Sequence, residues 1–216
     1  MLKFLYSDVC WRRETDKKEI FLTFDDGPIP EITPWVLDTL EAFQVKATFF
    51  CIGENVQKYP DIFREIVSRG HQTGNHTFNH LNGWKTKNEL YFDNIKKCAS
   101  LVDSKLFRPP YGKMKRSQYS ILTNTTSSKA NQLTINHLAC RQAGSPLTIV
   151  MWDVLSGDFD TNTSPEKCLK NVIQNTRNGS IVVFHDSIKA KKNLQFAMPR
   201  YIEESLRKGY FFRVLN

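Results

Sequence analysis

Short apolar, β-branched runs alternate with helical patterns along almost the whole chain of 216 residues, and this alternation restricts the fold more than any other feature. Regular alternation of strand and helix is typical of βαβ units and a parallel sheet. The chain shows no break in composition, so we predict a single domain over 1–216, a distorted and incomplete (β/α)7 barrel. An open doubly wound sheet is the alternative. The predicted strands are residues 20–24, 46–52, 71–74, 105–108, 147–152, 180–184 and 210–214.

Helix signals lie between these runs. Thr33-Pro34 predicts a capped helix start, and the sequence TKNE at 86–89 predicts a capping box for another helix. A last helix is expected from about Pro199 to Lys208. Each helix is expected to cover the sheet between two consecutive strands.

The composition is that of an ordinary globular protein, with 40% hydrophobic and 24% charged residues. Residues 123–146 are polar and weakly patterned, which predicts a surface insertion before the fifth strand. No apolar stretch is long enough to cross a membrane. No signal peptide is recognisable, so we expect a cytoplasmic monomer, or a periplasmic or cell-surface protein if a leader has been removed. The odd set of five cysteines lacks metal-type spacing and suggests a reducing compartment.

The net charge of +8 suggests either simple solubility or an anionic partner. Basic residues cluster at 113–116 and 189–192, after the fourth and sixth predicted strands. No aromatic-interleaved nucleic-acid motif accompanies them, so nucleic acid is not expected as a partner. An anionic or extended substrate is the expectation that these clusters support.

Unusual polar residues come directly after the predicted strands. Asp25 and Asp26 follow the first strand in TFDDGP, and His76 and His80 follow the third in HTFNH. Further residues of this kind end the later strands, namely Arg108, Trp152, Asp153 and His185, and Asp158 follows five residues after Asp153. The carboxyl ends of the strands build the active site of an α/β barrel, so these side chains are predicted to share one rim.

The spacing of His76 and His80 suits a metal ion, because one helical turn or a tight loop would point both rings at it. With one carboxylate they form the open catalytic zinc pattern, which leaves a position for water. A bound cation lowers the pKa of that water to about 7. It also relieves the repulsion between Asp25 and Asp26, one of which stays free to accept a proton. The alternative for the two acids is a simple Asx turn.

Two further groups complete a hydrolytic site. Arg108 is a plausible counter-charge that holds the base ionised, or else an ordinary surface arginine. His185 is a candidate general acid, with a neutral core histidine as the alternative. Asp158 or Asp153 would raise the pKa of His185 and set its tautomer, and Asp158 is preferred.

The two remaining histidines are not expected to bind metal or to take part in catalysis. His71 falls inside the third predicted strand, where a structural histidine is expected. His137 lies in the predicted insertion and is not assigned a role. The candidate site therefore includes three of the five histidines of the chain.

In order, TFDDGP, HTFNH, RPPYG, WDVLSGDFD and IVVFHD resemble the five motifs of the polysaccharide deacetylases, the carbohydrate esterase family 4 with its NodB homology domain. The match runs from about 20 to 186. The resemblance implies a distorted (β/α)7 barrel with the active site at the carboxyl ends of the strands. It also implies a metal-dependent deacetylase of acetylated sugars, with one divalent ion, Zn²⁺ or else Co²⁺ or Ni²⁺.

The resemblance implies a role for each matching residue. The base, the residue that orients it, the general acid and the residue that tunes the acid are, in this order, Asp25, Arg108, His185 and Asp158. The metal ligands are Asp26, His76 and His80. The backbone N–H of Tyr111 is expected at the oxyanion, and the acetyl-methyl pocket is expected to be lined by Val183 and by Phe159 or Trp152.

Two departures stand out in the fourth motif. Phe159 stands where the family often has tryptophan, and Leu155 where many members have an acidic residue. We expect hydrolysis of the acetamido group of an N-acetylated amino sugar, in a glycan of chitooligosaccharide or peptidoglycan type. The alternatives are an O-acetyl esterase of acetylxylan type, an amidohydrolase of small amides, and a glycan-binding domain without catalysis.

Overall fold

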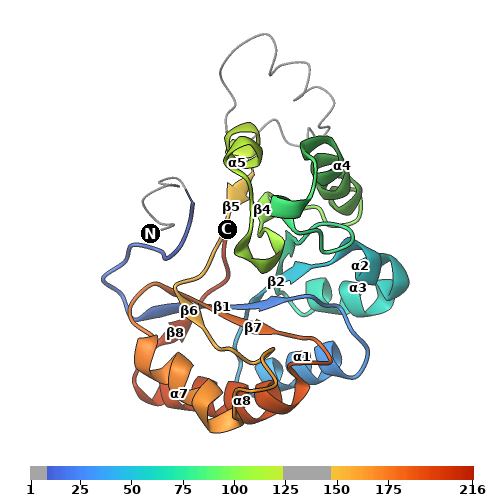
Figure 1. Cartoon of the computed structure of the whole chain (residues 1–216). Helices are drawn as coiled ribbons and strands as arrows, with labels where there is room; N and C mark the ends of the chain where they lie inside the picture. Colours follow the sequence, from blue (N-terminus) through green and yellow to red (C-terminus); the bar gives the residue numbers. More distant parts are fainter. Residues whose placement is uncertain (1–8, 124–146) are drawn as a thin grey trace.

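The computed structural model describes residues 9–123 and 147–216, in which a single parallel sheet curls into half of a barrel (Figure 1). The strand order is β5-β4-β3-β2-β1-β7-β6, and β8 pairs with the start of β1. The predicted (β/α)7-type architecture is confirmed. The strands are β1 (Glu19–Asp25), β2 (Thr48–Cys51), β3 (Gln72–Asn75), β4 (Leu106–Phe107), β5 (Thr148–Ile149), β6 (Val154–Leu155), β7 (Ser180–His185) and β8 (Phe211–Phe212).

The two-residue strand β6 is the one described strand that the sequence pattern did not predict. It lies in VLSGD, just after the predicted run 147–152, where polar and turn residues follow Val154 and Leu155 at once. The predicted insertion at 123–146 lies outside the described residues, except Thr123 at the end of a helix.

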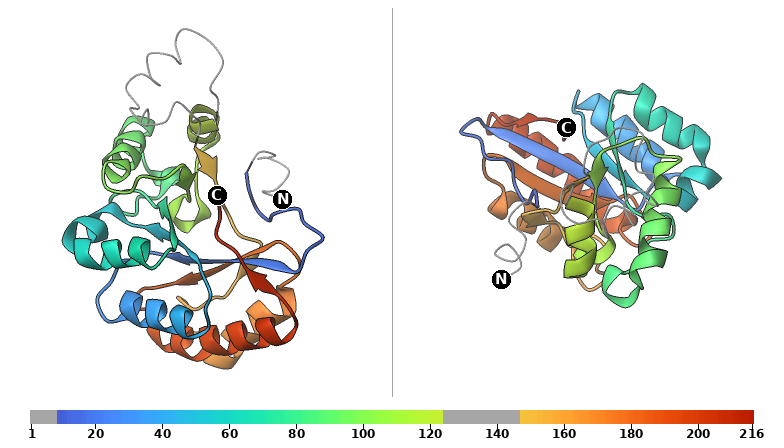
Figure 2. Two further views of the ribbon diagram at one scale, coloured as in Figure 1. Left: turned by 180° about the vertical axis from the view of Figure 1, so that it is seen from behind. Right: turned by 90° about the horizontal axis from the view of Figure 1, so that it is seen from above.

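Helices lie on the outside of the curved sheet, with α1, α7 and α8 grouped below β1 and β7 in the view of Figure 1, and Figure 2 shows them from two other sides. Within the described ranges, none of the helices has both the length and the apolar character to cross a bilayer. The helices are α1 (Ile32–Ala42), α2 (Gly53–Lys58), α3 (Pro60–Ser68), α4 (Asn88–Ala99), α5 (Arg116–Thr123), α7 (Pro165–Asn175) and α8 (Lys191–Arg207), with 3-10 turns η2 (Gly83–Lys85) and η3 (Pro110–Gly112).

Three helix starts differ from the sequence prediction. The capping box is wrong: α4 begins at Asn88 with no side-chain cap, and the Thr86 hydroxyl instead donates to the Asn82 carbonyl at 2.7 Å. Thr33 lies inside α1, where its hydroxyl makes a long-range hydrogen bond rather than a cap. Helix α8 begins at Lys191 and contains Pro199. Its buried apolar face outweighs the proline, because most helical stability in proteins comes from packing.

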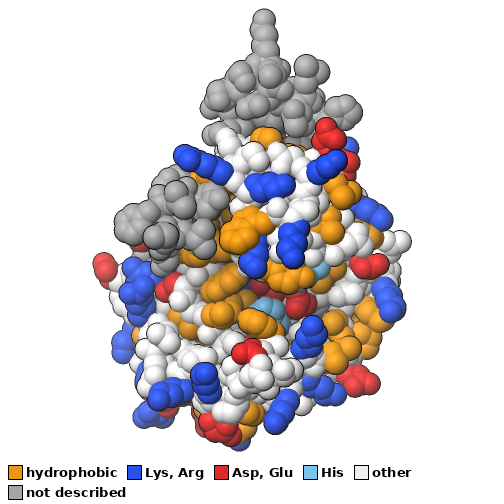
Figure 3. All heavy atoms as spheres, viewed as in Figure 1, with side chains coloured by type: hydrophobic (Ala, Val, Ile, Leu, Met, Phe, Trp, Pro, Cys, Tyr) orange, Lys and Arg blue, Asp and Glu red, His pale blue; other side chains and the backbone are white. Residues whose placement is uncertain are grey.

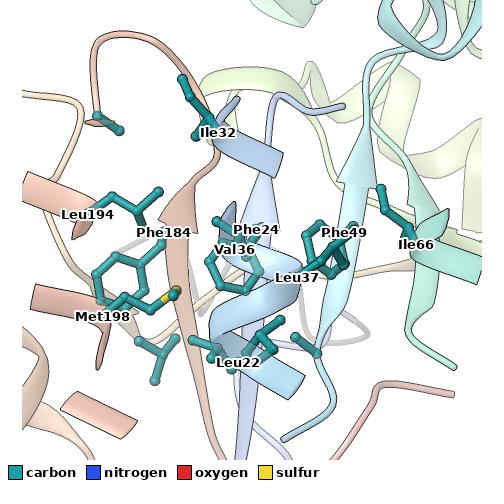
Figure 4. Packing of buried hydrophobic residues seen from close by; sticks show 14 of the residues in the cluster. Leu22, Phe24, Ile32, Val36, Leu37, Phe49, Ile66, Phe184, Leu194 and Met198 are labelled. Carbon is teal, nitrogen blue, oxygen red and sulfur yellow. The ribbon is translucent and has the colours of Figure 1, made fainter. Parts of the chain in front are cut away.

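The core is split by the sheet into an outer and an inner part. Alternate residues of a strand face opposite sides, so Ile20, Leu22 and Phe24 of β1 pack outward, and Phe21 packs inward. Figure 4 shows the outer part, where strand and helix side chains interlock: Leu22, Phe24, Phe49 and Phe184 from the sheet, and Val36, Leu37, Leu194 and Met198 from the helices. The inner part is smaller, and it leaves the carboxyl end of the barrel open to polar side chains.

Candidate metal and catalytic site

The inward face of the central strands places an acid beside a histidine. On β1 the inward positions continue from Phe21 through Thr23 to Asp25, and on β7 they end at His185. The parallel register of these two strands pairs Asp25 directly with His185. Both predicted catalytic residues therefore stand side by side at the carboxyl end of the sheet.

Asp26 is brought to the same site by a sharp change of backbone direction. Strand β1 ends at Asp25, and Asp26 has a φ of 87°, in the left-handed region that residues other than glycine rarely adopt. An extended strand would have sent these two side chains to opposite faces. The turn is what lets two adjacent acids serve one site.

Asp26, His76 and His80 converge, with ligand atoms all within 4.8 Å of one another. The distances to Asp26 Oδ1 are 3.8 Å from His76 Nε2 and 3.3 Å from His80 Nε2. The chain makes a tight loop between the two histidines rather than a helical turn, with positive φ at Thr77 and His80. The predicted grouping of one carboxylate and two imidazoles is present.

The chemistry of these three side chains fits a divalent cation. The Arg108 carbonyl lies 2.7 Å from His76 Nδ1, which as an N–H donor leaves Nε2 with its lone pair toward the site. Burial lowers the pKa of His76 and of His80 to about 3, so both rings are neutral at pH 7. Asp26 Oδ1 is buried and has no hydrogen bond within the described ranges, and burial raises the pKa of Asp26 to about 6. Two neutral imidazoles around an unpaired carboxylate oxygen form a ligand set.

Arg108 is fully buried and holds Asp25 from inside the barrel. Its Nη1 lies 2.6 Å from Asp25 Oδ1 and also donates to the Thr23 hydroxyl at 2.8 Å. Its other nitrogens donate to the carbonyls of Val150 and Met151. Burial lowers the pKa of Arg108, and the charge of Asp25 opposes this change. The predicted contact between Arg108 and Asp25 is confirmed, and the surface alternative is excluded.

His185 is held by Asp158, as preferred from the sequence. Asp158 is fully buried, and its two oxygens lie 2.8 Å from His185 Nδ1 and 2.7 Å from the His185 backbone nitrogen. Burial alone would lower the pKa of His185, but the charge and hydrogen bond of Asp158, helped by Asp25 and Asp26, raise it to about 9. The imidazole is therefore protonated at neutral pH, as a general acid requires.

The rejected alternative, Asp153, serves the other end of β7. Its Oδ1 accepts from the Ile181 backbone N–H at 2.8 Å, and its Oδ2 accepts from the Ser180 hydroxyl at 3.1 Å. Both partners lie at the start of β7, far along the strand from His185. Asp153 is thus a structural carboxylate with no contact to His185.

These groups open into a cavity of about 600 Å³, which Figure 3 shows as a hollow with a histidine and an acidic side chain at its base. Of the four expected substrate residues, Tyr111, Trp152 and Phe159 line this cavity. Val183 is fully buried, two residues before His185 on β7, so its role at the acetyl methyl group stays a prediction. Apolar and basic side chains that add to the wall are Ile29, Ile52, Leu155, Ile188, Lys113 and Lys189.

Two aromatic rings stand at the mouth of the cavity. The Phe159 ring is 42% exposed, and its centroid lies 4.9 Å from that of His185 in an edge-to-face contact. The Tyr111 ring is 58% exposed and lies 4.5 Å from His80. The backbone of Tyr111 has a φ of 61° in η3, which begins three residues after the end of β4. Phenylalanine at 159 therefore still places an aromatic wall beside His185.

A family model described as polysaccharide deacetylase matches residues 12–134. The chain belongs to this family. Members of the polysaccharide deacetylase family depend on a metal, and the group of Asp26, His76 and His80 is a possible site for it.

Curated and solved relatives of this polysaccharide deacetylase agree with the family. A peptidoglycan-N-acetylglucosamine deacetylase of Bacillus cereus is 30% identical over 94% of this chain and 89% of its own length. The chain spans only 57% of a longer Bacillus cereus protein of the same description, at 34% identity over 80% of this chain. The crystal structure of the Bc1960 peptidoglycan N-acetylglucosamine deacetylase superimposes with a TM-score of 0.77, at 29% identity and covering 96% of this chain and 91% of that one.

The structure also identifies residues around Asp26 that sequence reasoning missed. Asp186 is fully buried, and its oxygens accept from the Gly27 backbone N–H at 3.0 Å and from the Thr33 hydroxyl at 2.6 Å. Burial raises the pKa of Asp186 to about 8, with the Thr33 hydrogen bond acting in the opposite direction. The available signal was the acidic residue that ends IVVFHD, directly after His185.

His71 is structural, as expected. It lies one residue before β3 and is 6% exposed. Its Nδ1 accepts from the Ala47 backbone N–H, and its ring packs edge-on against Phe49. Burial lowers its pKa to about 4, so it is a neutral core histidine. His137 lies outside the described residues.

Proposed function

We propose that this protein hydrolyses the acetamido group of N-acetylated amino sugars in a glycan of peptidoglycan or chitooligosaccharide type. One observation carries the proposal: a three-ligand metal site is flanked by two separate proton-transfer groups. Asp25 is held by Arg108 at 2.6 Å, and His185 is held by Asp158 at 2.8 Å. A binding protein has no need for both a base and an acid beside a metal site.

The first half of the reaction depends on Asp25. Asp26, His76 and His80 would hold a divalent cation, which when bound would supply Lewis-acid polarisation and a water of lowered pKa. Asp25 accepts the proton of the attacking water as general base, and Arg108 orients its carboxylate through their hydrogen bond. The backbone N–H of Tyr111 stabilises the negative charge on the acetyl oxygen, a contact worth about 3–4 kcal/mol.

The second half depends on His185. The imidazolium donates its Nε2 proton to the departing amine, while its Nδ1–H stays on the ring and donates to Asp158, which fixes the ring orientation. The edge-to-face contact with the partly exposed Phe159 restricts the movement of the His185 ring. The proton acceptor Asp25 and the proton donor His185 have different environments. Asp25 contacts the buried guanidinium of Arg108, and His185 contacts the buried carboxylate of Asp158.

Zinc is the metal that the ligands favour, with cobalt or nickel as alternatives. Two imidazole nitrogens and one carboxylate oxygen form the three-ligand pattern of catalytic zinc sites. Imidazole also suits nickel, and affinity alone does not separate these metals. Metal content of the purified protein would identify the native ion.

The cavity wall favours an extended and anionic glycan. Lys113 and Lys189 belong to the two basic clusters, which are far apart in the sequence, and both side chains line the cavity. Ile188 and Tyr111 beside them are 75% and 58% exposed, so apolar surface continues outward from the site. Carboxylate-bearing glycan strands would meet both features, since charge attracts the chain and apolar surface packs against sugar rings.

The test is an acetate-release screen in which metal content is measured on the same protein sample. N-acetylated chitooligosaccharides, peptidoglycan fragments and acetylated xylan serve as substrates, and Asp25→Asn serves as the matched inactive control. We expect acetate from the N-acetylated glycans, lost on chelation and restored by zinc. Release from acetylated xylan alone would favour an O-acetyl esterase, and glycan binding without release in any metal form would contradict catalysis.

A further inference from the structure

Asp26 depends on its surroundings for the backbone conformation that makes it a ligand. Its φ of 87° is one that an aspartate adopts only when neighbouring structure enforces it. The carboxylate faces His76 and His80 only in this conformation, because the preceding strand directs Asp25 into the barrel. Whatever fixes the peptide group after Asp26 therefore controls the metal site.

Two side chains from distant segments hold this peptide group from both sides. The amide nitrogen of Asn55, in α2, donates to the Asp26 carbonyl at 2.7 Å. The N–H of the same peptide group, on Gly27, donates to Asp186 Oδ1 at 3.0 Å. The donor and the acceptor of one peptide unit are thus both satisfied by side chains, which fixes its orientation.

Asp186 is itself held rigidly. Its second oxygen accepts from the Thr33 hydroxyl of α1 at 2.6 Å, and its backbone N–H donates to the Asp25 carbonyl at 3.1 Å. A Cβ atom on Gly27 would lie 2.0 Å from Asp186 Oδ2. The carboxyl group therefore packs directly on the main chain of Gly27, and this position requires glycine.

We propose that Asp186 and Asn55 are positioning residues for the metal: they fix the Asp26–Gly27 peptide group and so aim the Asp26 carboxylate at the two histidines. Their contacts with Asp26 and Gly27 are to main-chain atoms, and neither belongs to the ligand group. The inference rests on the metal site of the proposed function. Partners that orient metal ligands commonly change metal affinity by about 10–100-fold when they are removed.

Asp153 offers a matched control. Like Asp186, it is a buried carboxylate that accepts one backbone N–H and one side-chain hydroxyl, here from Ile181 and Ser180. It does so at the opposite end of β7. Replacing either acid removes the same kinds of hydrogen bond, but only Asp186 contacts the residue that follows a metal ligand.

The experiment measures zinc affinity of the full chain by competition with a chromogenic chelator, and thermal unfolding of the metal-free protein. We expect Asp186→Ala and Asn55→Ala to weaken zinc binding by about 10–100-fold. Asp186→Asn keeps an oxygen acceptor for the Gly27 N–H and should recover most of the affinity. Asp153→Ala should lower the unfolding temperature and leave zinc affinity unchanged.

A folded Asp186→Ala protein with wild-type zinc affinity would overturn the assignment, as would an equal loss of affinity in Asp153→Ala. If Asp186→Ala does not fold, Asn55→Ala decides, because Asn55 is partly exposed on a short surface helix, and unchanged affinity there overturns the proposal. Zinc binding is measured without glycan, so a wild-type protein that binds zinc but releases no acetate contradicts only the proposed function. A wild-type protein that binds no zinc overturns both.

Discussion

Replacing Asp158 by asparagine should move the alkaline limit of activity to lower pH. The substitution keeps one oxygen that can accept from His185 Nδ1–H, and it removes the buried negative charge together with the acceptor for the His185 backbone N–H. Activity needs the protonated imidazole and is lost as pH rises through its pKa. Lowering that pKa therefore moves the loss of activity toward neutral pH.

The structure sets the size of this effect. The pKa of His185 is raised from 6.5 to about 9 although burial acts in the opposite direction, and Asp158 is the leading cause of the rise. At about 1.4 kcal/mol per pKa unit, the imidazolium is favoured by roughly 3 kcal/mol relative to an exposed histidine. Without the charge of Asp158, burial is opposed only by Asp25 and Asp26, so we expect the alkaline limit to fall by about two pH units.

The assay is kcat/KM as a function of pH for wild type and Asp158→Asn, with an NMR titration of the His185 imidazole in the metal-free protein. A bound cation would lower the alkaline limit of activity in both wild type and Asp158→Asn. The prediction therefore concerns the difference between the limits of the two proteins. Asp153→Asn is the matched control, because it removes a buried charge that does not contact His185. An unchanged limit in Asp158→Asn, or an equal change in the control, would refute the reasoning.

Three further predictions concern the base, its partner and pH. Asp25→Asn should retain zinc and lose activity by about 10²–10⁴-fold, and metal content together with acetate release checks this; substantial remaining activity would remove the base assignment. Arg108→Met should lower the free energy of unfolding by about 3–5 kcal/mol, because it leaves Asp25 buried and unpaired, and in denaturant titrations the double variant with Asp25→Asn should recover part of the loss; purely additive losses would contradict this. The metal-free protein should lose stability as pH rises from 6.5 to about 9, because folded His185 binds its proton more tightly than the unfolded chain does. The contribution of His185 to the free energy of unfolding is therefore complete below pH 6.5 and is lost as pH rises through about 9. Urea midpoints measured across this range check the prediction, and midpoints that rise with pH would contradict it.

Local sequence patterns were sufficient to predict the fold and the main residues of the candidate site. The strand runs, the turn residues after TFDD and the four-residue spacing of HTFNH are short-range features. They predicted a parallel barrel with Asp25, Asp26, His76, His80 and His185 at the carboxyl ends of its strands. The alternation along β1 then explains why Asp25 points inward, since a period of two is a property of the strand itself.

Contacts between distant segments were decided only by the tertiary structure. The sequence favoured Asp158 over Asp153 as the partner of His185 without excluding Asp153, and the pairing of β6 with β7 determines which one reaches the ring. The same holds for Asp186 and Asn55, which contact one peptide group from two segments separated by more than a hundred residues. Turn and strand signals depend on residues that are close in the sequence. These contacts depend on how distant helices and strands pack together, which no local sequence pattern specifies.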